Sequence, residues 1–483
     1  MYRKKRATSR PVEVREPFNE TARLLDKAIR EAGVPLAERE DFLKWTIDSL
    51  WQSFRSERMN QRIIIENEIK ALGIRLPNGT VKTDYSSTFS LPLDKISDVR
   101  LEGADALGLT LIKSQEDGTF TICGKPLKPG DFSLKITYAT VPGEPRSQLL
   151  IPVAFNPDPR SLWRDIPTDK NIPYPKPDTI AEYVKVEAGF DGSPKKDMVA
   201  ASRRGRSHAQ EGKPRDDHFT IFHCPASDWY IMAVADGAGS ARYSRKGSEV
   251  ACDTVVEHCR ERLTDNLAFE NAIKIWQLDP DNREKRTVVT RTVIDIIYNG
   301  ALKAYEAIKR TAFTADGGKL RDYATTLMFV VCKKFSFGWF LASFWVGDGA
   351  MCLFDANRKT AKLLGTPDEG EFSGQTRFIT MHEIFRDPDM AAKRLRMAVV
   401  SDFTALFLMT DGVSDPMFET EKNLNDYAKW EEFYKKLQKG FPDDEIGGVD
   451  LSDDNPKAAG QLLEWLNFWS PGNHDDRTIA MLY

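Results

Sequence analysis

The segment VADGAGSARYSRKGSEVA, residues 234–251, places an aspartate between an apolar strand and a helix. It follows WYIMA, so Asp236 ends a run of residues that favours a buried strand. Gly237 and Gly239 allow a tight turn, and the residues from Ser244 onward have the spacing of an amphipathic helix. A turn alone explains most Asp-Gly pairs. A carboxylate at this position also suits a cation, to which a nearby backbone carbonyl adds another oxygen ligand.

The composition is that of an ordinary globular protein and excludes several classes of function. The 483 residues are 41% hydrophobic and 29% charged, and this length indicates two or three domains. A net charge of −4 gives no electrostatic reason to bind nucleic acid or an anionic membrane. The basic opening MYRKKRATSR is not followed by an apolar segment, and no later run approaches the roughly 20 residues of a membrane span. We therefore expect a cytoplasmic protein with no nucleic-acid or membrane partner.

Changes in residue pattern divide the chain into five predicted parts. Helical spacing of apolar residues gives way to an alternation with period two, and many prolines then precede the last part. The parts are a basic flexible tail (1–16), a helical segment (17–80), a small antiparallel β-sandwich (81–156), a proline-rich linker (157–180) and a final domain (181–483). The sandwich sequence ALGLTLIKSQEDGTFTICGKPLKPGDFSLKITYA resembles immunoglobulin or cadherin-like modules, which implies a spacer or a site for a protein partner.

Five segments of the final domain each offer aspartate at a predicted strand boundary. They contain, in order, Asp216 and Asp217, Asp236, Asp348, Asp411 with Asp415, and Asp475 with Asp476. Carboxylates that meet in a fold repel one another and are costly to bury unless cations neutralise them. Magnesium and manganese suit such oxygen ligands, and two ions about 4 Å apart activate a water and hold a phosphoryl group. The pattern therefore indicates a two-metal site for phosphoryl chemistry.

The order and the sequences of these motifs resemble those of the metal-dependent PP2C-type protein serine/threonine phosphatases, especially their bacterial branch. The match consists of SHAQEGKPRDD, VADGAGS with the GSEVA helix, ATTLMFVV, WVGDGAMCLF, LMTDGVSD and HDDRTIAML, over roughly 280 residues. The resemblance implies an α+β fold, an αββα sandwich of two antiparallel sheets flanked by helices such as 245–263 and 289–311. This fold would follow the helical segment and the small β-sandwich.

The resemblance also implies metal ligands, residue by residue. Asp236 matches the aspartate that bridges two metals, and Gly237 matches the glycine that supplies a carbonyl. Asp411 and Asp475 match the residues that complete one site, so Asp236, Asp411 and Asp475 are the expected catalytic residues. The remaining expected ligands are Asp216 and Asp217 in the first motif, and Asp348 and Asp415, which with Asp411 would hold a third, weaker ion.

One departure concerns the phosphate-binding arginine that many relatives carry before the first acidic pair. The family spacing puts Gly212 at this place. Arg206 and His208 in GRSH are the predicted substitutes, with Lys213 and Arg215 as the alternative pair, because each can contact a phosphate oxygen. A solvated surface charge is the simpler interpretation for any one of them.

The implied activity is hydrolysis of phosphoserine or phosphothreonine monoesters without a covalent phosphoenzyme, by a water activated between two Mg²⁺ or Mn²⁺ ions. No cysteine lies in a glycine-rich phosphate loop followed by arginine, and no P-loop is present in the sequence, which disfavours tyrosine-phosphatase and nucleotide-hydrolase chemistry. Two alternatives remain: a signalling scaffold with weak activity that recruits a partner through its N-terminal modules, and a phosphatase for small molecules. A phosphoprotein substrate and a cognate serine/threonine kinase are the partners expected by analogy.

Overall fold

The computed structural model describes residues 16–114, 118–141, 144–187, 195–314, 318–368, 376–386 and 393–483, with side chains described from residue 23 onward. The chain forms two compact units, Met1–Leu162 and Trp163–Tyr483, called here the N-terminal and C-terminal units. The predicted basic tail therefore lies almost entirely outside the described residues. The division between the units falls inside the predicted proline-rich linker.

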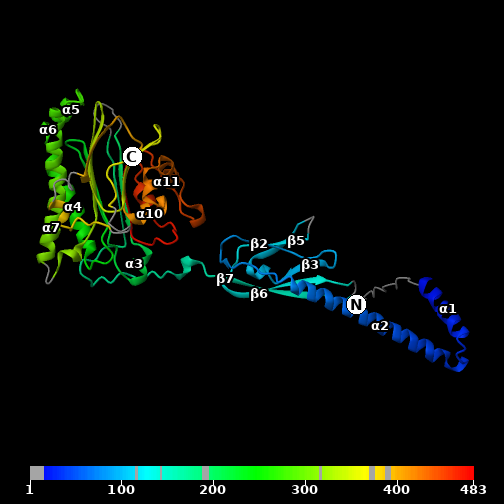
Figure 1. Cartoon of the computed structure of the whole chain (residues 1–483). Helices are drawn as coiled ribbons and strands as arrows, with labels where there is room; N and C mark the ends of the chain where they lie inside the picture. The colour runs from blue at the N-terminus through cyan, green and yellow to red at the C-terminus, as the bar shows by residue number, and fades with distance from the viewer. Residues whose placement is uncertain are drawn as a thin grey trace, which may run out of the picture. The chain divides into compact units, whose positions relative to one another are not determined.

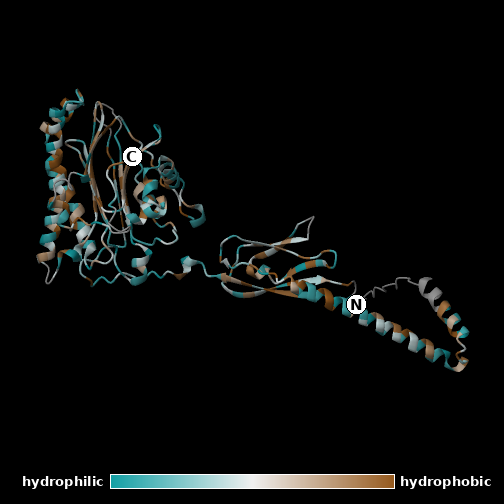
Figure 2. Cartoon of the chain, viewed as in Figure 1, coloured by the Kyte–Doolittle hydropathy of each residue, from teal (hydrophilic) through white to brown (hydrophobic). Residues whose placement is uncertain are grey.

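Two helices open the N-terminal unit, α1 (Glu16–Glu31) and α2 (Arg39–Ala71). The end of α2 packs against the strands of this unit, because Ile69 is buried in their core and the Ser147 hydroxyl donates to Glu66 at 2.6 Å. The earlier turns of α2 leave large apolar side chains exposed, and Figure 2 shows brown residues recurring along the helix. The exposed set on α2 is Phe42, Trp45, Ile47, Leu50, Trp51, Phe54, Met59, Ile63 and Ile64.

The strands of the N-terminal unit form two small sheets around one apolar core, in which Leu109, Ile122 and Ile136 are fully buried. One sheet has the order β1-β7-β6-β3 and the other β2-β5-β4, and every pairing except β1 with β7 is antiparallel. The bounds are β1 (Gly79–Thr80), β2 (Tyr85–Ser90), β3 (Ser97–Glu102), β4 (Leu109–Lys113), β5 (Thr119–Gly124), β6 (Gly130–Ala139) and β7 (Ser147–Asn156). The predicted small sheets are confirmed, whereas the likeness to immunoglobulin or cadherin modules stays a prediction.

Two antiparallel sheets form the centre of the C-terminal unit, with orders β10-β11-β12-β13-β16 and β15-β14-β17-β18-β9-β8. The first sheet comprises β10 (His218–Cys224), β11 (Trp229–Ala235), β12 (Leu327–Phe335), β13 (Gly338–Val346) and β16 (Leu395–Val400). The second comprises β8 (Thr179–Val184), β9 (Met198–Arg203), β14 (Ala350–Asp355), β15 (Thr360–Leu363), β17 (Ala405–Met409) and β18 (Arg477–Leu482). Most of these strands are buried on both faces, which explains their nearly continuous apolar sequence.

Helices cover the outer face of each sheet (Figure 1). Alternate residues of β11 face different cores: Ile231 packs under the helices, and Met232 packs between the sheets. The helices on the first sheet are α4 (Ser244–Leu263), α5 (Leu267–Gln277), α6 (Arg283–Val293) and α7 (Asn299–Thr314), and those on the second are α10 (Asp411–Phe418), α11 (Tyr427–Lys439) and α12 (Ala458–Trp465). The layers are therefore α, β, β and α, as predicted.

The predicted helix 245–263 corresponds to α4, but the predicted helix 289–311 is longer and irregular. It begins at Arg283 with α6, passes through a π-helical segment at Ile294–Tyr298 and continues as α7 to Thr314. A π-helical segment adds residues to a turn without a change in hydrophobicity, so apolar spacing does not reveal it. Among the described residues, no helix combines the length and hydropathy needed to cross a bilayer.

Candidate active site

The predicted acidic residues meet at one end of the two sheets. Asp217 directly precedes β10 and Asp236 directly follows β11, and the pairing of His218 with Ala235 places these two aspartates side by side. In the second sheet, Asp411 follows the end of β17, and Asp476 precedes the start of the adjacent antiparallel strand β18. Antiparallel pairing therefore brings segments far apart in the sequence to one edge.

Asp236, Asp348 and Asp411 form the centre of the site. Each offers a carboxylate oxygen, and these oxygens lie within 4.8 Å of one another. The carboxyl groups of Asp217 and Asp475 are close enough to perturb Asp236, and both also perturb Asp411. Carboxyl groups at this spacing do not all ionise unless a cation or a shared proton offsets their repulsion. The structure thus brings together all three predicted catalytic residues.

The pKa values of these carboxyl groups reflect that repulsion. Burial, followed by the charges of neighbouring aspartates, raises the pKa of Asp236 and of Asp411 well above the usual range. Burial and the charge of Asp476 raise the pKa of Asp217 to about 7 and that of Asp216 to about 6. Burial and the charge of Asp348 raise the pKa of Asp415 to about 6. Burial and mutual repulsion thus favour the protonated forms of these five carboxyl groups when no cation is bound.

Unpartnered oxygens show that the site fits hard divalent cations. Oδ1 of Asp348 and Oδ1 of Asp411 are buried and have no hydrogen-bond partner among the described residues, although Oδ2 of Asp348 accepts from the Thr376 hydroxyl. A buried carboxylate oxygen without a partner loses its hydration at a cost of about 1–3 kcal/mol or more. Mg²⁺ and Mn²⁺ prefer carboxylate and carbonyl oxygen, which is the donor set present here.

Threonines of the ATT motif fix the backbone of the central aspartate. The Asp236 backbone N–H donates to the Thr326 hydroxyl at 2.8 Å, and its carbonyl accepts from Thr326 N at 2.8 Å and from the Thr325 hydroxyl at 2.7 Å. Gly237 lies so close to the first motif that a Cβ would be 2.7 Å from the Asp216 carbonyl oxygen. The sequence pattern predicted no role for these threonines, because they lie about 90 residues from their partner.

Asp217 is fixed by two other threonines. The Thr410 and Thr478 hydroxyls donate to its Oδ2 at 2.8 and 2.7 Å. Both hydrogen bonds are made to Oδ2. The other carboxylate oxygen of Asp217 therefore remains available on the side that faces Asp236. Neither threonine was among the predicted site residues, although Thr410 lies inside the motif LMTDGVSD and Thr478 inside HDDRTIAML.

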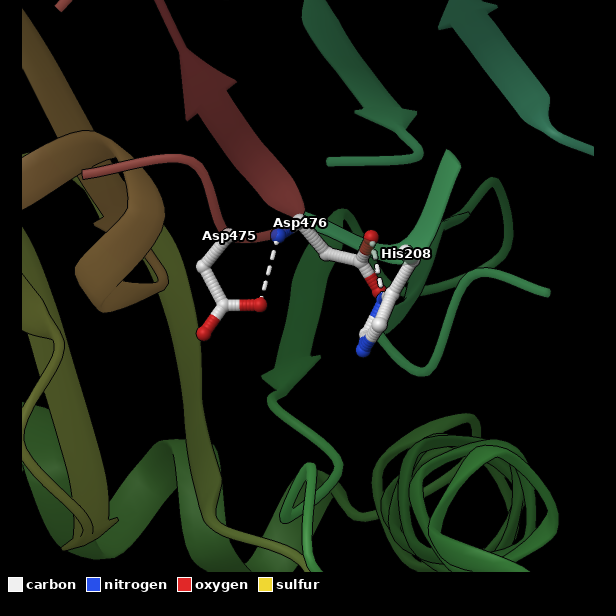
Figure 3. A group of neighbouring side chains, drawn as sticks. All are labelled: His208, Asp475 and Asp476. Carbon is white, nitrogen blue, oxygen red and sulfur yellow. Dashed lines mark hydrogen bonds and ion pairs between the residues drawn. The ribbon is translucent and has the colours of Figure 1, made fainter. Parts of the chain in front are cut away.

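Asp475 and Asp476 have different surroundings despite being adjacent. Asp476 accepts from the backbone N–H groups of Gly205 at 2.6 Å and Asp216 at 2.5 Å, and its Oδ1 lies 3.0 Å from His208 Nδ1. Figure 3 shows the Asp476 carboxylate turned toward the His208 ring and the Asp475 carboxylate directed away from it. Asp476 therefore organises the backbone of the first motif, and Asp475 is left for the acidic centre.

The predicted phosphate-binding residues have protein partners. Arg206 donates to the carbonyl oxygens of Asn467 at 2.9 Å and Phe468 at 3.2 Å. His208 is mostly buried between Asp476 and Asp216, and although burial lowers its pKa, the Asp476 charge more than offsets this and raises it to about 9. Their role toward phosphate stays a prediction.

The sequence of residues 204–466 matches the family described as Protein phosphatase 2C. Because this match spans more than half of the chain, the chain belongs to the protein phosphatase 2C family, and the sandwich described above is the fold of that family. No curated protein sequence matches the chain.

Solved structures of bacterial phosphatases are similar to the chain at low identity. PppA of Pseudomonas aeruginosa, a regulatory component of the T6SS, is 12% identical with a TM-score of 0.34, and the match covers 60% of this chain and 97% of PppA. For the serine/threonine phosphatase of S. agalactiae the identity is 13%, the TM-score 0.31 and the coverage 63% and 99%. For the catalytic domain of the phosphatase PstP, solved in complex with two manganese ions, the identity is 15%, the TM-score 0.29 and the coverage 63% and 98%.

Proposed function

We propose that this chain is a protein serine/threonine phosphatase that depends on Mg²⁺ or Mn²⁺. Membership of the family implies phosphoric monoester hydrolysis. The observation that carries the proposal is the convergence of Asp236, Asp348 and Asp411, each of which offers a carboxylate oxygen within 4.8 Å of the others. Oδ1 of Asp348 and Oδ1 of Asp411 are also buried without a hydrogen-bond partner among the described residues. At neutral pH the carboxyl groups of such a cluster can all ionise only when cations are bound.

In this proposal, acidic residues of the chain bind the metal ions, and neighbouring hydroxyl groups fix the orientation of these ligands. Asp236, Asp411 and Asp475 are the proposed principal ligands, with Asp217 beside them and the Gly237 carbonyl as a further oxygen donor. Two divalent cations, when bound, supply the Lewis acidity that activates water and neutralises phosphoryl charge. The threonine hydroxyls on Asp217 and the backbone of Asp236 fix the ligands before substrate arrives, which is the preorganisation that electrostatic catalysis needs.

A third cation is proposed beside the first two, held by Asp348, Asp411 and Asp415. Asp411 and Asp415 are one helical turn apart at the start of α10, so both side chains project from the same face. The influence of Asp348 on the pKa values of both residues supports this grouping, because it means that the three carboxyl groups interact. Asp216, whose backbone is held by Asp476, is an additional proposed ligand.

The test is release of phosphate from a phosphothreonine peptide by the full chain with Mn²⁺, with Mg²⁺ and with EDTA. We expect turnover with either metal and none with EDTA. Asp236→Asn should lose more than the roughly 100-fold that the loss of an outer contact can cost, because this change removes a proposed ligand from the centre of the site. A phosphoserine peptide, a nucleoside monophosphate and a sugar phosphate complete the panel. Turnover of the small molecules alone would favour the small-molecule phosphatase, and no turnover under any condition would favour the signalling scaffold.

The proposal includes partners that follow from the reaction. A protein phosphatase acts on a phosphoprotein, and a serine/threonine kinase must supply that phosphate. The exposed apolar side chains of α2 are large enough to bind a protein partner of the N-terminal unit. We place the protein in the cytoplasm, where such kinases and their substrates meet.

A further inference from the structure

Part of the predicted linker is built into the C-terminal unit. We call residues 163–178 the strap. Trp163 packs on His474, with ring centroids 4.3 Å apart, next to the last acidic motif. Ile166 N donates to the Ala209 carbonyl at 2.9 Å, and Asp165 pairs with Arg204 at 2.5 Å, so the strap also contacts the first motif. A flexible linker would make no such series of contacts.

The second half of the strap is anchored on α4. Arg245 donates to the carbonyl oxygens of Pro173 at 2.6 Å and Tyr174 at 2.9 Å. The Tyr174 ring lies 5.6 Å from the Tyr243 ring and 6.2 Å from the Tyr323 ring, both edge-on. These contacts hold the strap just before Lys176.

Lys176 lies behind the acidic pair of the first motif. Its side chain is buried, and Nζ donates to the Asp217 carbonyl at 3.0 Å and to the Ser248 hydroxyl at 3.0 Å. The Ser248 hydroxyl in turn donates to the Asp216 carbonyl at 2.5 Å. The two carbonyls of the Asp-Asp pair are thus held by one lysine and one serine, with Arg215 as a second donor to the Asp217 carbonyl at 3.0 Å.

A lysine is seldom buried without a specific purpose, because its ammonium group loses hydration that few contacts replace. A methionine would fill the same space without this cost. The hydrogen bonds of Lys176 go to main-chain and hydroxyl oxygens, none of them a charged side chain, so the lysine acts on the backbone that carries the two aspartates.

We propose that Lys176 is a positioning residue for the metal site and that it acts through the backbone carbonyls of Asp216 and Asp217. The strap is then a component of the active site. This inference rests on the proposed function only in that the acidic cluster binds divalent cations. Outer contacts of this kind orient metal ligands, and their loss typically lowers metal affinity about 10–100-fold.

The experiment compares Mn²⁺ binding by the full chain and by Lys176→Met, measured by electron paramagnetic resonance of free Mn²⁺. We expect the Mn²⁺ dissociation constant to rise about tenfold or more, and the Mn²⁺ concentration for half-maximal hydrolysis to rise in parallel. At saturating Mn²⁺, kcat should return to within about threefold of the unchanged chain, because the ligands themselves are intact. Ser248→Ala, which removes only a hydroxyl, should raise the dissociation constant in the same direction and keeps the test decisive if Lys176→Met does not fold.

Lys196→Met is the matched control. Lys196 is partly buried, its Nζ lies 3.5 Å from the Thr404 carbonyl, and it precedes β9, at the opposite end of that strand from the acidic site. This control should lose stability without a change in Mn²⁺ affinity. Mn²⁺ affinity within about twofold of the unchanged chain in folded Lys176→Met or Ser248→Ala would overturn the proposal. Mn²⁺ binding without phosphopeptide turnover would instead contradict the proposed function and leave this comparison valid.

Discussion

At the scale of single residues, the two adjacent aspartates of the last motif show how surroundings divide similar side chains between two roles. Asp476 accepts backbone hydrogen bonds and pairs with His208, so its charge is compensated inside the protein. Burial would raise its pKa, but His208 and the backbone N–H groups more than offset this and lower it. The pKa of Asp475 is raised by burial and by the charge of Asp476. The Asp476 carboxylate therefore stabilises the fold, whereas the raised pKa of Asp475 fits its proposed role as a metal ligand.

Substitution of these neighbours should therefore have opposite effects on the metal-free protein. Asp476→Asn removes the nearer of the two carboxylates beside buried His208 and leaves only Asp216, 3.7 Å away, so we expect a loss of about 2 kcal/mol in the free energy of unfolding. Asp475→Asn removes a repelled charge, so the metal-free protein should keep or gain stability while Mn²⁺ affinity falls. Urea unfolding with EDTA, together with Mn²⁺ titration, measures both effects. Equal destabilisation by the two variants would contradict this assignment.

The raised pKa of Asp217 predicts a pH dependence of stability. Its pKa is 3.8 as the reference value and about 7 in the folded chain, so the folded state binds the proton more tightly. This contribution is fully present below pH 3.8 and is lost as the pH rises through 7. Between pH 5 and 8 the metal-free chain should therefore lose, relative to Asp217→Asn, on the order of 2 kcal/mol of unfolding free energy.

Unfolding at several pH values in EDTA measures this difference. Mn²⁺ should remove it for the unchanged chain, because a cation takes the place of the proton. A difference between the two proteins that does not vary with pH would show that Asp217 titrates near its ordinary value.

At the scale of elements, glycines allow the motif loops to approach one another. A Cβ at Gly412, the second residue of α10, would lie 1.9 Å from the Asp476 carbonyl oxygen, and one at Gly205 would lie 2.3 Å from the Asp475 carbonyl carbon. Any side chain at these positions would separate α10 or the first motif from the segment before β18. Glycine is required at these two positions because another backbone segment packs directly against them, and not because the chain needs an unusual backbone conformation there.

Gly237 and Gly239 give a matched pair for this argument. A Cβ at Gly237 would lie 2.7 Å from the Asp216 carbonyl oxygen, whereas a Cβ at Gly239 meets no atom within 4 Å. Gly237→Ala should cost about 1–3 kcal/mol and weaken Mn²⁺ binding, because the backbone must move beside a ligand. Gly239→Ala should change neither by more than about 0.5 kcal/mol. Thermal unfolding and Mn²⁺ titration of both variants check this, and indistinguishable variants would contradict the packing explanation.

At the scale of the whole molecule, the two units have separate apolar cores. The acidic site lies wholly in the C-terminal unit. A ligand that binds one folded unit stabilises that unit by mass action and leaves an independent unit unchanged.

Calorimetry should therefore show two unfolding transitions, only one of which responds to metal. Mn²⁺ at about 100 times its dissociation constant should stabilise the C-terminal unit by about 2.7 kcal/mol. Buried tryptophans such as Trp229, Trp339 and Trp345 report this transition by fluorescence, whereas Trp45 and Trp51 of the N-terminal unit are already exposed. An equal shift of both transitions would show that the units unfold together.

The sequence by itself predicted the strands and the aspartates at their boundaries, and its resemblance to a known family implied the order of the layers. Alternation of apolar residues predicts strands, and each motif aspartate follows or precedes such a strand, which is local information. The full extent of the helix that includes a π-helical segment could not be predicted in this way, because its spacing is irregular. The resemblance singled out Asp475, but no local pattern revealed that Asp476 pairs with His208, since both aspartates stand at the same strand boundary.

Only the tertiary structure decided which groups surround each ligand. Asp217 meets Thr410 and Thr478 across 193 and 261 residues, and Lys176 reaches the Asp217 carbonyl from a segment whose composition is typical of a linker. No local pattern encodes these distances, because they arise when antiparallel pairing and two packed sheets bring remote strand ends to one edge. The sequence therefore identifies the aspartates proposed as metal ligands, whereas their geometry and their outer contacts are properties of the folded chain.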